Sequence, residues 1–400
     1  MELLLGRRRA TIKEAVVIHP RFTLYGGGEV VSLHVCKVLQ DLGYHVHLAC
    51  DNFSPEEVQQ HFGLGGIMKK CTHVPVQGEF SPFLARRFLA YQRAIYSIRL
   101  LNSIKIPDNC ELVFSTQSML YFKPNLFNFC VAYDLADFFY AHQIGSTTTR
   151  SPLKSIYYYP LQRLYKRYAT RMSEKENFFI PLSHAIEQSL NDLHYPHSPS
   201  VFPPCDMSFR PMPKERYAVN TSRLVPSKRL EDFIEIARRL PRYKFVIVGK
   251  MSKTEEILFP SYKEKLLASL PSNAKLIEAI VREHKQLVER AKLYLYPSVE
   301  PGVSISLGQA MGAGCIPITP SVGGGAEMVE ASDTGYMYRS LDEAAEIVKQ
   351  AFESNAPKDS PDHIAERARI FSADSFDERI REIIEEKSGE SIHAHDPRDP

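Results

Sequence analysis

The stretch AKLYLYPSVEPGVSISLGQAMGAGCIPIT (291–319) joins two apolar runs through a broken turn and a row of small residues. The first run ends near Ser298, and Pro301 and Gly302 interrupt the chain before a short helical pattern that starts at Val303. A buried strand, a turn, a helix and a second buried strand are typical of a βαβ unit with parallel strands. The stretch therefore predicts an α/β fold.

Similar apolar runs recur along the chain, with helical patterns between them, in two series. The clearest helix follows Gly28 and is ended by Gly43. Between the series, HYPHSPSVFPPCD (194–206) is rich in proline and lacks periodicity, which is typical of a linker. We therefore expect two doubly wound domains that face a central cleft. The expected strands cover 15–19, 45–51, 111–116, 128–134 and 177–183 in the first domain, and 244–250, 274–280, 291–298 and 315–320 in the second.

Composition excludes several classes of protein. The net charge of +2 on 400 residues does not suit nucleic-acid binding. The seven cysteines never form a Cys-x-x-Cys pair, so we expect reduced thiols rather than disulfides or a zinc site. No apolar run approaches the roughly 18–20 residues of a membrane span, and the first residues do not match a signal peptide. These features predict a cytoplasmic chain, or one on the cytoplasmic face of a membrane.

Two cations stand on one corner in TSRLVPSKRLEDFIEIARRL (221–240). Arg223 and Lys228 flank a turn that contains Pro226, directly before an amphipathic helix. A guanidinium can bind a diphosphate with two hydrogen bonds, and an ammonium acts on it as a point charge. The corner is therefore a candidate diphosphate site, and solvated surface charge is the alternative interpretation.

The turn in the opening stretch has two kinds of polar group. The backbone amides of Val303, Ser304 and Ile305 lie where the helix begins and are free to bind an anion. Glu300 is a poor phosphate ligand, but a carboxylate accepts hydrogen bonds strongly from hydroxyl groups. An anion site beside a hydroxyl acceptor fits a sugar phosphate.

A second glycine-rich turn, YGGGEVVSL (25–33), separates the first strand from the first helix. Glycines here let backbone amides approach an anion at the helix N-terminus. A dinucleotide fingerprint fails, because Val31 occupies the position of its third glycine. Asp51 ends the second strand, where a Rossmann fold has its ribose-binding acid, so a nucleotide cofactor and a plain tight turn remain alternatives.

Several motifs together resemble one family. They resemble the large retaining family of GT-B glycosyltransferases, family four, which includes mannosyl- and glucosyltransferases. The resemblance covers about 15–385 and implies two Rossmann-like domains. Residues 1–200 would bind the acceptor and 201–375 the nucleotide sugar, a helix over 376–387 would pack back on the first domain, and 388–400 would be a disordered tail. The motifs, in order, are GGGE (26–29), SRLVPSKR (222–229), PSVEPGVSISLGQAMGAGCIPI (297–318) and GGGAEMV (323–329).

The resemblance also implies roles for individual residues. Arg223 and Lys228 match the pair that neutralises the diphosphate leaving group, and Glu300 matches the acid that faces the donor sugar. The remaining donor-binding candidates are backbone groups that meet the phosphates from the two domains. These are Gly302, Val303 and Ser304 in the second domain and Gly27 and Gly28 in the first.

Two positions depart from the family pattern. The family's second acid, which binds the ribose hydroxyls, follows the first by eight residues, but position 308 is glycine and Gln309 stands one residue later. Glutamine can still accept from a hydroxyl, without charge. Many relatives also have a histidine near Tyr133, where this chain has none. Asp134 is our candidate catalytic substitute, with Asp137 as a second choice and a strand-end cap as the alternative.

The resemblance implies transfer of a hexose of the mannose or glucose type from a GDP- or UDP-linked donor to a glycan or lipid-linked acceptor, with retention. No cofactor is expected, and no metal, because the chain lacks an Asp-x-Asp pair. The departures raise an alternative, a catalytically weak or non-catalytic sugar-nucleotide-binding subunit of a glycosylation complex. A dinucleotide-dependent oxidoreductase would use Asp51 but would leave Arg223 and Lys228 without a role.

Two segments bear on the acceptor. Residues 81–107 and 151–172 are basic, aromatic and helical in pattern. Such helices can rest on an anionic membrane with their tyrosines at the interface, or they can simply have an apolar core face and a basic outer face. The first interpretation predicts peripheral contact with a membrane.

Overall fold

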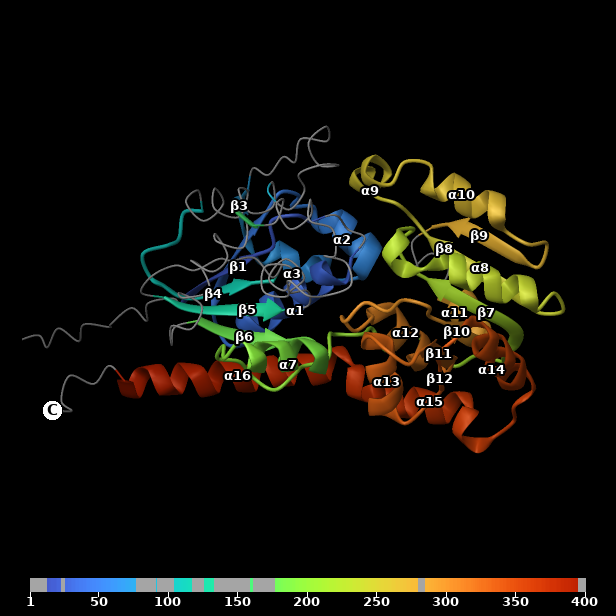
Figure 1. The fold of residues 1–400 in the computed structure, drawn as a ribbon. Helices are drawn as coiled ribbons and strands as arrows, with labels where there is room; N and C mark the ends of the chain where they lie inside the picture. Colours follow the sequence, from blue (N-terminus) through green and yellow to red (C-terminus); the bar gives the residue numbers. More distant parts are fainter. Residues whose placement is uncertain are drawn as a thin grey trace, which may run out of the picture.

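The computed structural model describes residues 13–22, 26–76, 91, 104–116, 126–132, 159–160, 177–279 and 285–394. These residues form two domains, each built on a six-stranded parallel sheet with helices packed against it (Figure 1). The strand orders are β3-β2-β1-β4-β5-β6 and β12-β11-β10-β7-β8-β9. In both sheets the chain starts at the centre, moves to one edge, and returns to build the other half. This is the doubly wound Rossmann order, so the predicted fold class is confirmed.

Most of the strands are short apolar runs that are buried on both faces, as parallel strands between helices require. Five of the six strands in the first sheet and four in the second lie close to the predicted runs. The first sheet contains β1 (Glu14–Ile18), β2 (His45–Cys50), β3 (Thr72–Pro75), β4 (Cys110–Ser115), β5 (Phe127–Ala132) and β6 (Asn177–Pro181). The second contains β7 (Glu215–Thr221), β8 (Lys244–Gly249), β9 (Ala274–Glu278), β10 (Ala291–Leu295), β11 (Ile316–Pro320) and β12 (Tyr336–Tyr338).

Three strands were not among the predicted runs, each for a physical reason. Strands β3 and β12 are short edge strands, and β3 is largely exposed, so neither has a continuous apolar run. Strand β7 is central, but it begins with charged residues and ends with Asn220 and Thr221. These two side chains are buried and hydrogen-bonded, Asn220 to the Leu295 carbonyl at 2.8 Å and Thr221 to the Tyr294 hydroxyl at 2.9 Å.

The helices cover the two faces of each sheet. The predicted first helix is α1 (Gly27–Asp41), and Gly43, which follows it, has a left-handed φ of 85° that favours glycine. The other helices near the first sheet are α2 (Pro55–Phe62), α3 (Gly65–Lys69) and α7 (His184–Asp192). Those of the second domain are α8 (Leu230–Arg239), α9 (Lys253–Leu258), α10 (Tyr262–Ser269), α11 (Lys285–Arg290), α12 (Ile305–Gly312), α13 (Gly324–Ser332), α14 (Leu341–Glu353) and α15 (Pro361–Arg367).

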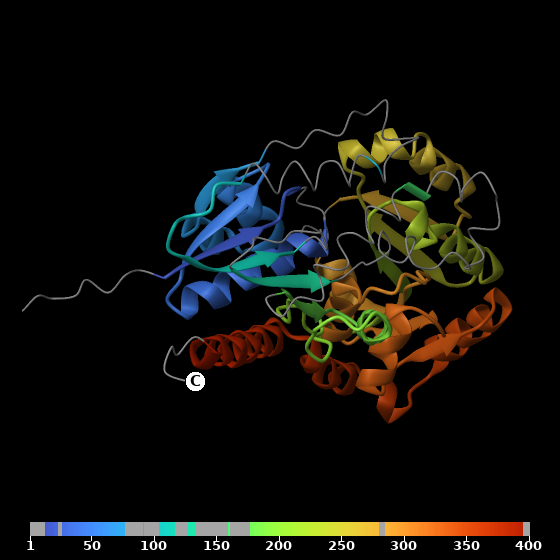
Figure 2. The ribbon, with the colours of Figure 1, turned by 60° about the vertical axis from the view of Figure 1, so that its left-hand side comes forward.

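The last helix, α16 (Ala373–Ala394), belongs to the first domain although it follows the second in sequence. It runs along α1 beneath the first sheet (Figures 1 and 2). Its apolar residues Phe376, Ile380, Ile383 and Ile384 are buried in the core of the first domain. The helix is longer than the expected 376–387 and includes part of the tail expected to be disordered, because no proline stops it before Pro397.

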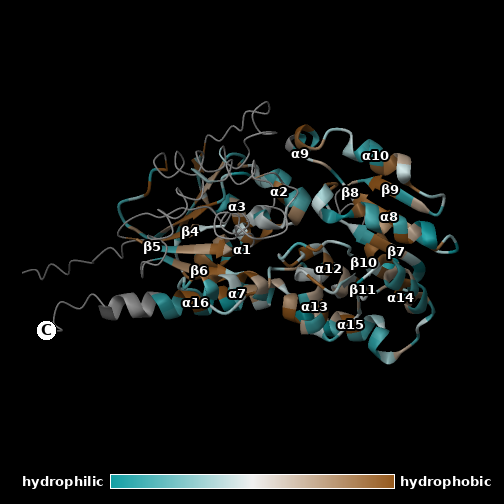
Figure 3. Cartoon of the chain, viewed as in Figure 1, coloured by the Kyte–Doolittle hydropathy of each residue, from teal (hydrophilic) through white to brown (hydrophobic). Residues whose placement is uncertain are grey.

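Each domain has its own hydrophobic core, and the apolar strands lie inside both (Figure 3). All seven cysteines are buried and free of disulfides. Among the described residues, no helix is both long and apolar enough to cross a membrane. The basic segments 81–107 and 151–172 fall almost wholly outside the described residues.

A buried carboxylate fixes α16 to α1. Asp377 lies within 2.8 Å of His34 Nδ1 and accepts a hydrogen bond from Lys37 Nζ at 2.7 Å. The side chains of Asp377 and His34 are less than a tenth exposed. Buried polar groups that lose a partner are costly, so this contact holds the position of α16.

Replacing Asp377 with alanine should lower the free energy of unfolding by about 2–3 kcal/mol, because His34 and the Lys37 ammonium lose their common partner. Denaturant unfolding of the purified chain measures the change. Glu382→Ala is the matched control on the same helix, since within the described part of the chain Glu382 pairs only with Arg379, on the exposed surface, and it should change stability by less than about 0.5 kcal/mol. Equal effects of the two substitutions would contradict the anchoring role of Asp377.

Candidate functional site

The candidate residues of the second domain follow its two central strands. Arg223 and Lys228 come after β7, and Glu300 comes after β10, which is the neighbour of β7. The strand order reverses between these two strands, and ligands of open α/β sheets bind outside the carboxyl ends of the strands at such a point. The topology alone therefore brings the predicted diphosphate corner and the predicted sugar-facing acid to one place.

Lys228 and Glu300 form an ion pair across this point. Lys228 ends a one-turn 3-10 helix (Pro226–Lys228), and its Nζ donates a hydrogen bond to Glu300 Oε2. Ser298 Oγ links the loops that carry the pair, because it accepts a hydrogen bond from the Glu300 amide at 3.3 Å and donates one to the Ser227 carbonyl at 3.2 Å. Tyr296 places its ring 5.9 Å from Lys228 Nζ.

The electrostatics keep both members of this pair charged. Burial by itself lowers the pKa of Lys228, but Tyr296 and Glu300 raise it, and the net pKa lies above that of an ordinary lysine. Burial likewise raises the pKa of Glu300, but Lys228 and, more weakly, Arg223 lower it below the usual range. The three charges are therefore close enough to influence one another. We call Arg223, Lys228 and Glu300 the charge cluster.

Arg223 is positioned by an acid that the sequence motifs did not indicate. Its Nη1 donates to Glu255 Oε1 at 2.8 Å, while Glu255 Oε2 accepts from the Ser252 amide at 2.8 Å. The Ser252 hydroxyl in turn accepts from the Glu255 amide, which completes a capping box at the start of α9. The Ser-x-x-Glu spacing was the available signal for the cap, but not for its contact with Arg223. Glu255 thus holds the guanidinium in place while almost half of the Arg223 side chain stays exposed.

The turn after Glu300 leads into α12. Gly302 and Val303 lie in the turn, and Ser304 is the N-cap residue, whose hydroxyl accepts from the Leu307 amide at 3.3 Å. The helix proper starts at Ile305, two residues later than predicted, since a serine cap has an extended backbone.

A glycine loop fixes the position of this turn. The Gly324 amide donates to the Glu300 carbonyl at 2.8 Å. A Cβ on Gly324 would lie 2.3 Å from the Gly302 carbonyl oxygen, and one on Gly323 would lie 2.8 Å from the Glu300 carbonyl oxygen. The two backbones therefore touch, which only glycine permits, and the GGGAEMV motif serves to hold the loop that carries Glu300.

The first domain faces the same turn. Helix α1 begins at Gly27 and Gly28, and a Cβ on Gly27 would lie 2.9 Å from Ile305 Cδ1 at the start of α12. The N-termini of two helices, one from each domain, therefore meet beside the charge cluster. Asp51 contributes to the fold instead, because its Oδ1 accepts a hydrogen bond from the Phe22 amide at 2.7 Å and so supports the connection between β1 and α1.

Packing explains why the family's second acid is absent at position 308. Gly308 is buried in α12, and a Cβ there would lie 2.4 Å from Cys205 Sγ, so no larger residue fits without movement. Gln309 follows it and is half-buried, and its side-chain amide makes no hydrogen bond within the described part of the chain. Gln309 is therefore free to bind a ligand. Asp134 and Asp137 lie outside the described residues, so their roles stay predictions.

One cross-domain contact was also missed from sequence. Glu327 of α13 accepts from the backbone amide of His184 at 2.8 Å and lies 2.9 Å from His184 Nδ1. His184 begins α7 of the first domain, directly after the cap residue Ser183, whose hydroxyl accepts from the Ile186 amide at 3.2 Å. Glu327, the acid of the GGGAEMV motif, thus contacts the turn that carries Ser183, and no local sequence pattern predicts this contact.

Residues 208–371 match the family model for glycosyl transferases group 1. The chain therefore contains a glycosyltransferase domain, and this domain includes the whole charge cluster. A comparison with curated protein sequences finds no match.

Solved structures of similar fold are also glycosyltransferases. Sucrose-phosphate synthase from Thermosynechococcus elongatus superposes with a TM-score of 0.72 at 12% identity, over 94% of this chain and 99% of that one. WaaG, a glycosyltransferase involved in lipopolysaccharide biosynthesis, gives 0.64 at 17% identity, over 92% and 99%. Alr3699/HepE from Anabaena in complex with UDP-glucose gives 0.65 at 15%, over 93% and 99%. At these identities the likeness establishes the two-domain GT-B fold.

Gly324→Ala should destabilise the chain by about 1–3 kcal/mol, because its Cβ would meet backbone atoms of Gly302 that no rotamer change can move. Gly66→Ala is the control: it lies in α3 with no atom within 4 Å of the added Cβ, and it should be neutral or stabilise by about 0.5 kcal/mol. Thermal unfolding of both variants tests the contact. A neutral Gly324→Ala would contradict the close approach of the two loops.

Proposed function

We propose that the protein is a retaining glycosyltransferase of family four, which moves a hexose from a UDP- or GDP-linked donor to a glycan or lipid-linked acceptor. The observation that carries the proposal is the charge cluster within the group 1 match, where two cations and one acid lie beside the turn into α12, whose N-terminus meets that of α1. Complexes of HepE with UDP and UDP-glucose support a nucleotide-sugar donor, and UDP as the first base to test.

The charge cluster suits the departure of a nucleoside diphosphate. Negative charge develops on the leaving phosphate, and fixed cations and amides stabilise it without reorganising. Arg223 is oriented by Glu255 and has exposed donors, so it can bind the diphosphate with its free guanidinium edge. Lys228 has three N–H donors and uses one for Glu300, which leaves two for phosphate oxygens.

Glu300 is the group proposed to face the sugar. Its pKa is held low by Lys228, so it is a carboxylate at neutral pH and accepts hydrogen bonds from hydroxyl groups. The amides of Gly302, Val303 and Ser304 face the phosphates from the second domain, and Gly27 and Gly28 face them from the first. The cations supply the charge that a divalent ion supplies in other transferases, which is the reason to propose metal-independent transfer.

The proposal for the acceptor is based on the sequence. The basic, aromatic segments 81–107 and 151–172 support a cytoplasmic enzyme that touches an anionic membrane surface and takes a lipid-linked or other membrane glycan. A structural neighbour, WaaG, is involved in lipopolysaccharide biosynthesis, which supports a lipid-linked acceptor as the first class to test.

Alanine in place of Arg223 or Lys228 should lower kcat/KM for donor turnover by about 100-fold or more, since each removes charge from the leaving diphosphate. The full chain is incubated with UDP- and GDP-hexoses, nucleoside diphosphate release is measured with EDTA present, and NMR of the product reports the anomeric configuration. Lys265→Ala, an exposed lysine of α10, is the matched control and should turn over normally. Near-normal rates for Arg223→Ala and Lys228→Ala would refute the assignment.

A non-catalytic sugar-nucleotide-binding subunit is the second candidate, and the neutral Gln309 in place of the family's second acid favours it. A neutral ribose ligand binds the donor more weakly than a charged one, which would leave the chain a poor catalyst. In that case the same incubations would show nucleotide-dependent thermal stabilisation but no turnover with any donor.

Gln309→Glu tests whether this residue contacts the ribose. The added charge should tighten binding of the nucleoside diphosphate by a few-fold to about a hundredfold, since a hydrogen bond to a charged group is stronger than one to a neutral group by about 1–3 kcal/mol. Calorimetric titration with UDP and GDP measures the affinity. Gln350→Glu, which adds the same charge on the exposed surface of α14, should leave it unchanged. If Gln309→Glu binds as the wild type does, Gln309 does not contact the ribose.

A further inference from the structure

Glu14, His45 and His47 form a cluster at the end of the first sheet that is opposite to the proposed donor site. Glu14 begins β1, and His45 begins β2. The donor site lies beyond the carboxyl ends of the strands, whereas this cluster lies at their amino ends. It has no part in the function proposed above. We call these three residues the histidine–glutamate cluster.

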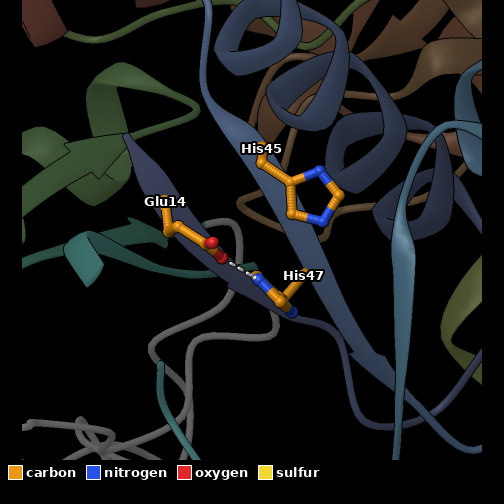
Figure 4. Close-up of side chains that lie close together, drawn as sticks. All are labelled: Glu14, His45 and His47. Atoms are coloured by element: carbon orange, nitrogen blue, oxygen red, sulfur yellow. Dashed lines mark hydrogen bonds and ion pairs between the residues drawn. The ribbon is translucent and has the colours of Figure 1, made fainter. Parts of the chain in front are cut away.

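The sheet register brings the three side chains together. Glu14 is paired with His45 in the parallel ladder, and Val16 is paired with His47. Side chains two residues apart on a strand point to the same face, so both histidines stand on the face that Glu14 shares (Figure 4). Each residue offers one ligand atom, and these atoms all lie within 4.8 Å of one another. The His45 and His47 rings are edge to face with their centroids 5.0 Å apart.

Hydrogen bonds already orient the cluster. His47 Nε2 pairs directly with Glu14 Oε2. Thr72 of β3 lies 2.8 Å from His45 Nε2, and Asn109 donates to Glu14 Oε1 at 3.5 Å. Such outer contacts fix the rings and the carboxylate of metal sites.

The burial of the cluster suits an ion that enters from solvent. The side chains of Glu14 and His47 are only 19% and 15% exposed, while His45 is the more open member. A cation bound among them would be sheltered by the sheet on one side and would keep a position for water on the other.

We propose that Glu14, His45 and His47 bind a Zn²⁺ ion that links β1 to β2. Two imidazole nitrogens and one carboxylate oxygen are a known ligand set for zinc, with water in the fourth position. Imidazole ligands disfavour Mg²⁺ and Ca²⁺, which prefer oxygen. The proposed ion displaces the proton of the hydrogen bond between His47 and Glu14. It stabilises the first domain, because the unfolded chain does not bring the three ligands together.

The test is a titration of the metal-free full chain with Zn²⁺ against a chromophoric chelator, together with thermal unfolding. We expect one equivalent to bind and the midpoint of unfolding to rise, with no such rise from Mg²⁺. His45→Ala and His47→Ala should each weaken binding at least tenfold. His363→Ala, an exposed histidine of α15, is the matched control and should bind as the wild type does. Wild-type affinity and stoichiometry in both cluster variants would overturn the proposal.

Because a variant can lose its fold, the wild-type chain provides a second measurement. Acylation of histidines by diethyl pyrocarbonate, mapped by mass spectrometry, should be slowed by Zn²⁺ at His45 and His47 but not at His363. Equal labelling of the cluster with and without Zn²⁺ would show that the ion binds elsewhere and would contradict the site. Neither measurement depends on glycosyl transfer, so the outcome is separate from that of the proposed function.

Discussion

The ion pair between Lys228 and Glu300 joins the two loops on which the second domain's site depends. These loops follow neighbouring strands, β7 and β10, but the chain leaves the two strands toward opposite halves of the sheet. Besides the ion pair, the hydrogen bond from the Ser298 hydroxyl to the Ser227 carbonyl links the same two loops. The pair holds them together, and the backbone contact between Gly324 and Gly302 fixes the loop after β10 against the loop after β11. Arg223, held by Glu255, completes a site whose charges are in place before a ligand arrives.

The sequence predicted most of the fold because buried parallel strands leave a simple pattern. A run such as KFVIVG (β8) is apolar on both faces, and few other structures require that. The apolar pattern does not predict a strand whose buried residues are polar and hydrogen-bonded. Strand β7 needs polar residues at its end, since Asn220 and Thr221 bond to β10, and polar residues break the apolar run.

The charge cluster could also be predicted, but its supports could not. Arg223, Lys228 and Glu300 lie in motifs with a local spacing, so their types and positions carry information. Glu255 and Glu327 act on residues 32 and 143 positions away, and a single sequence contains no record of such contacts. The glycine at 308 is the instructive case. From the sequence alone, Gly308 is interpreted as the loss of the family's second acid. In the structure Cys205 packs against it, so packing requires glycine at this position.

The chain crosses between the domains twice, and the two crossings lie side by side. The Cys205 amide donates to the Phe371 carbonyl at 2.9 Å, and the Ala373 amide donates to the Cys205 carbonyl at 3.1 Å. These hydrogen bonds join the two crossing segments into one connection between the domains. Gly308 of α12 packs against Cys205 at this connection. The helix that carries Gln309 therefore lies against the connection itself, so a change in the angle between the domains would act directly on the position of Gln309 in the proposed donor site.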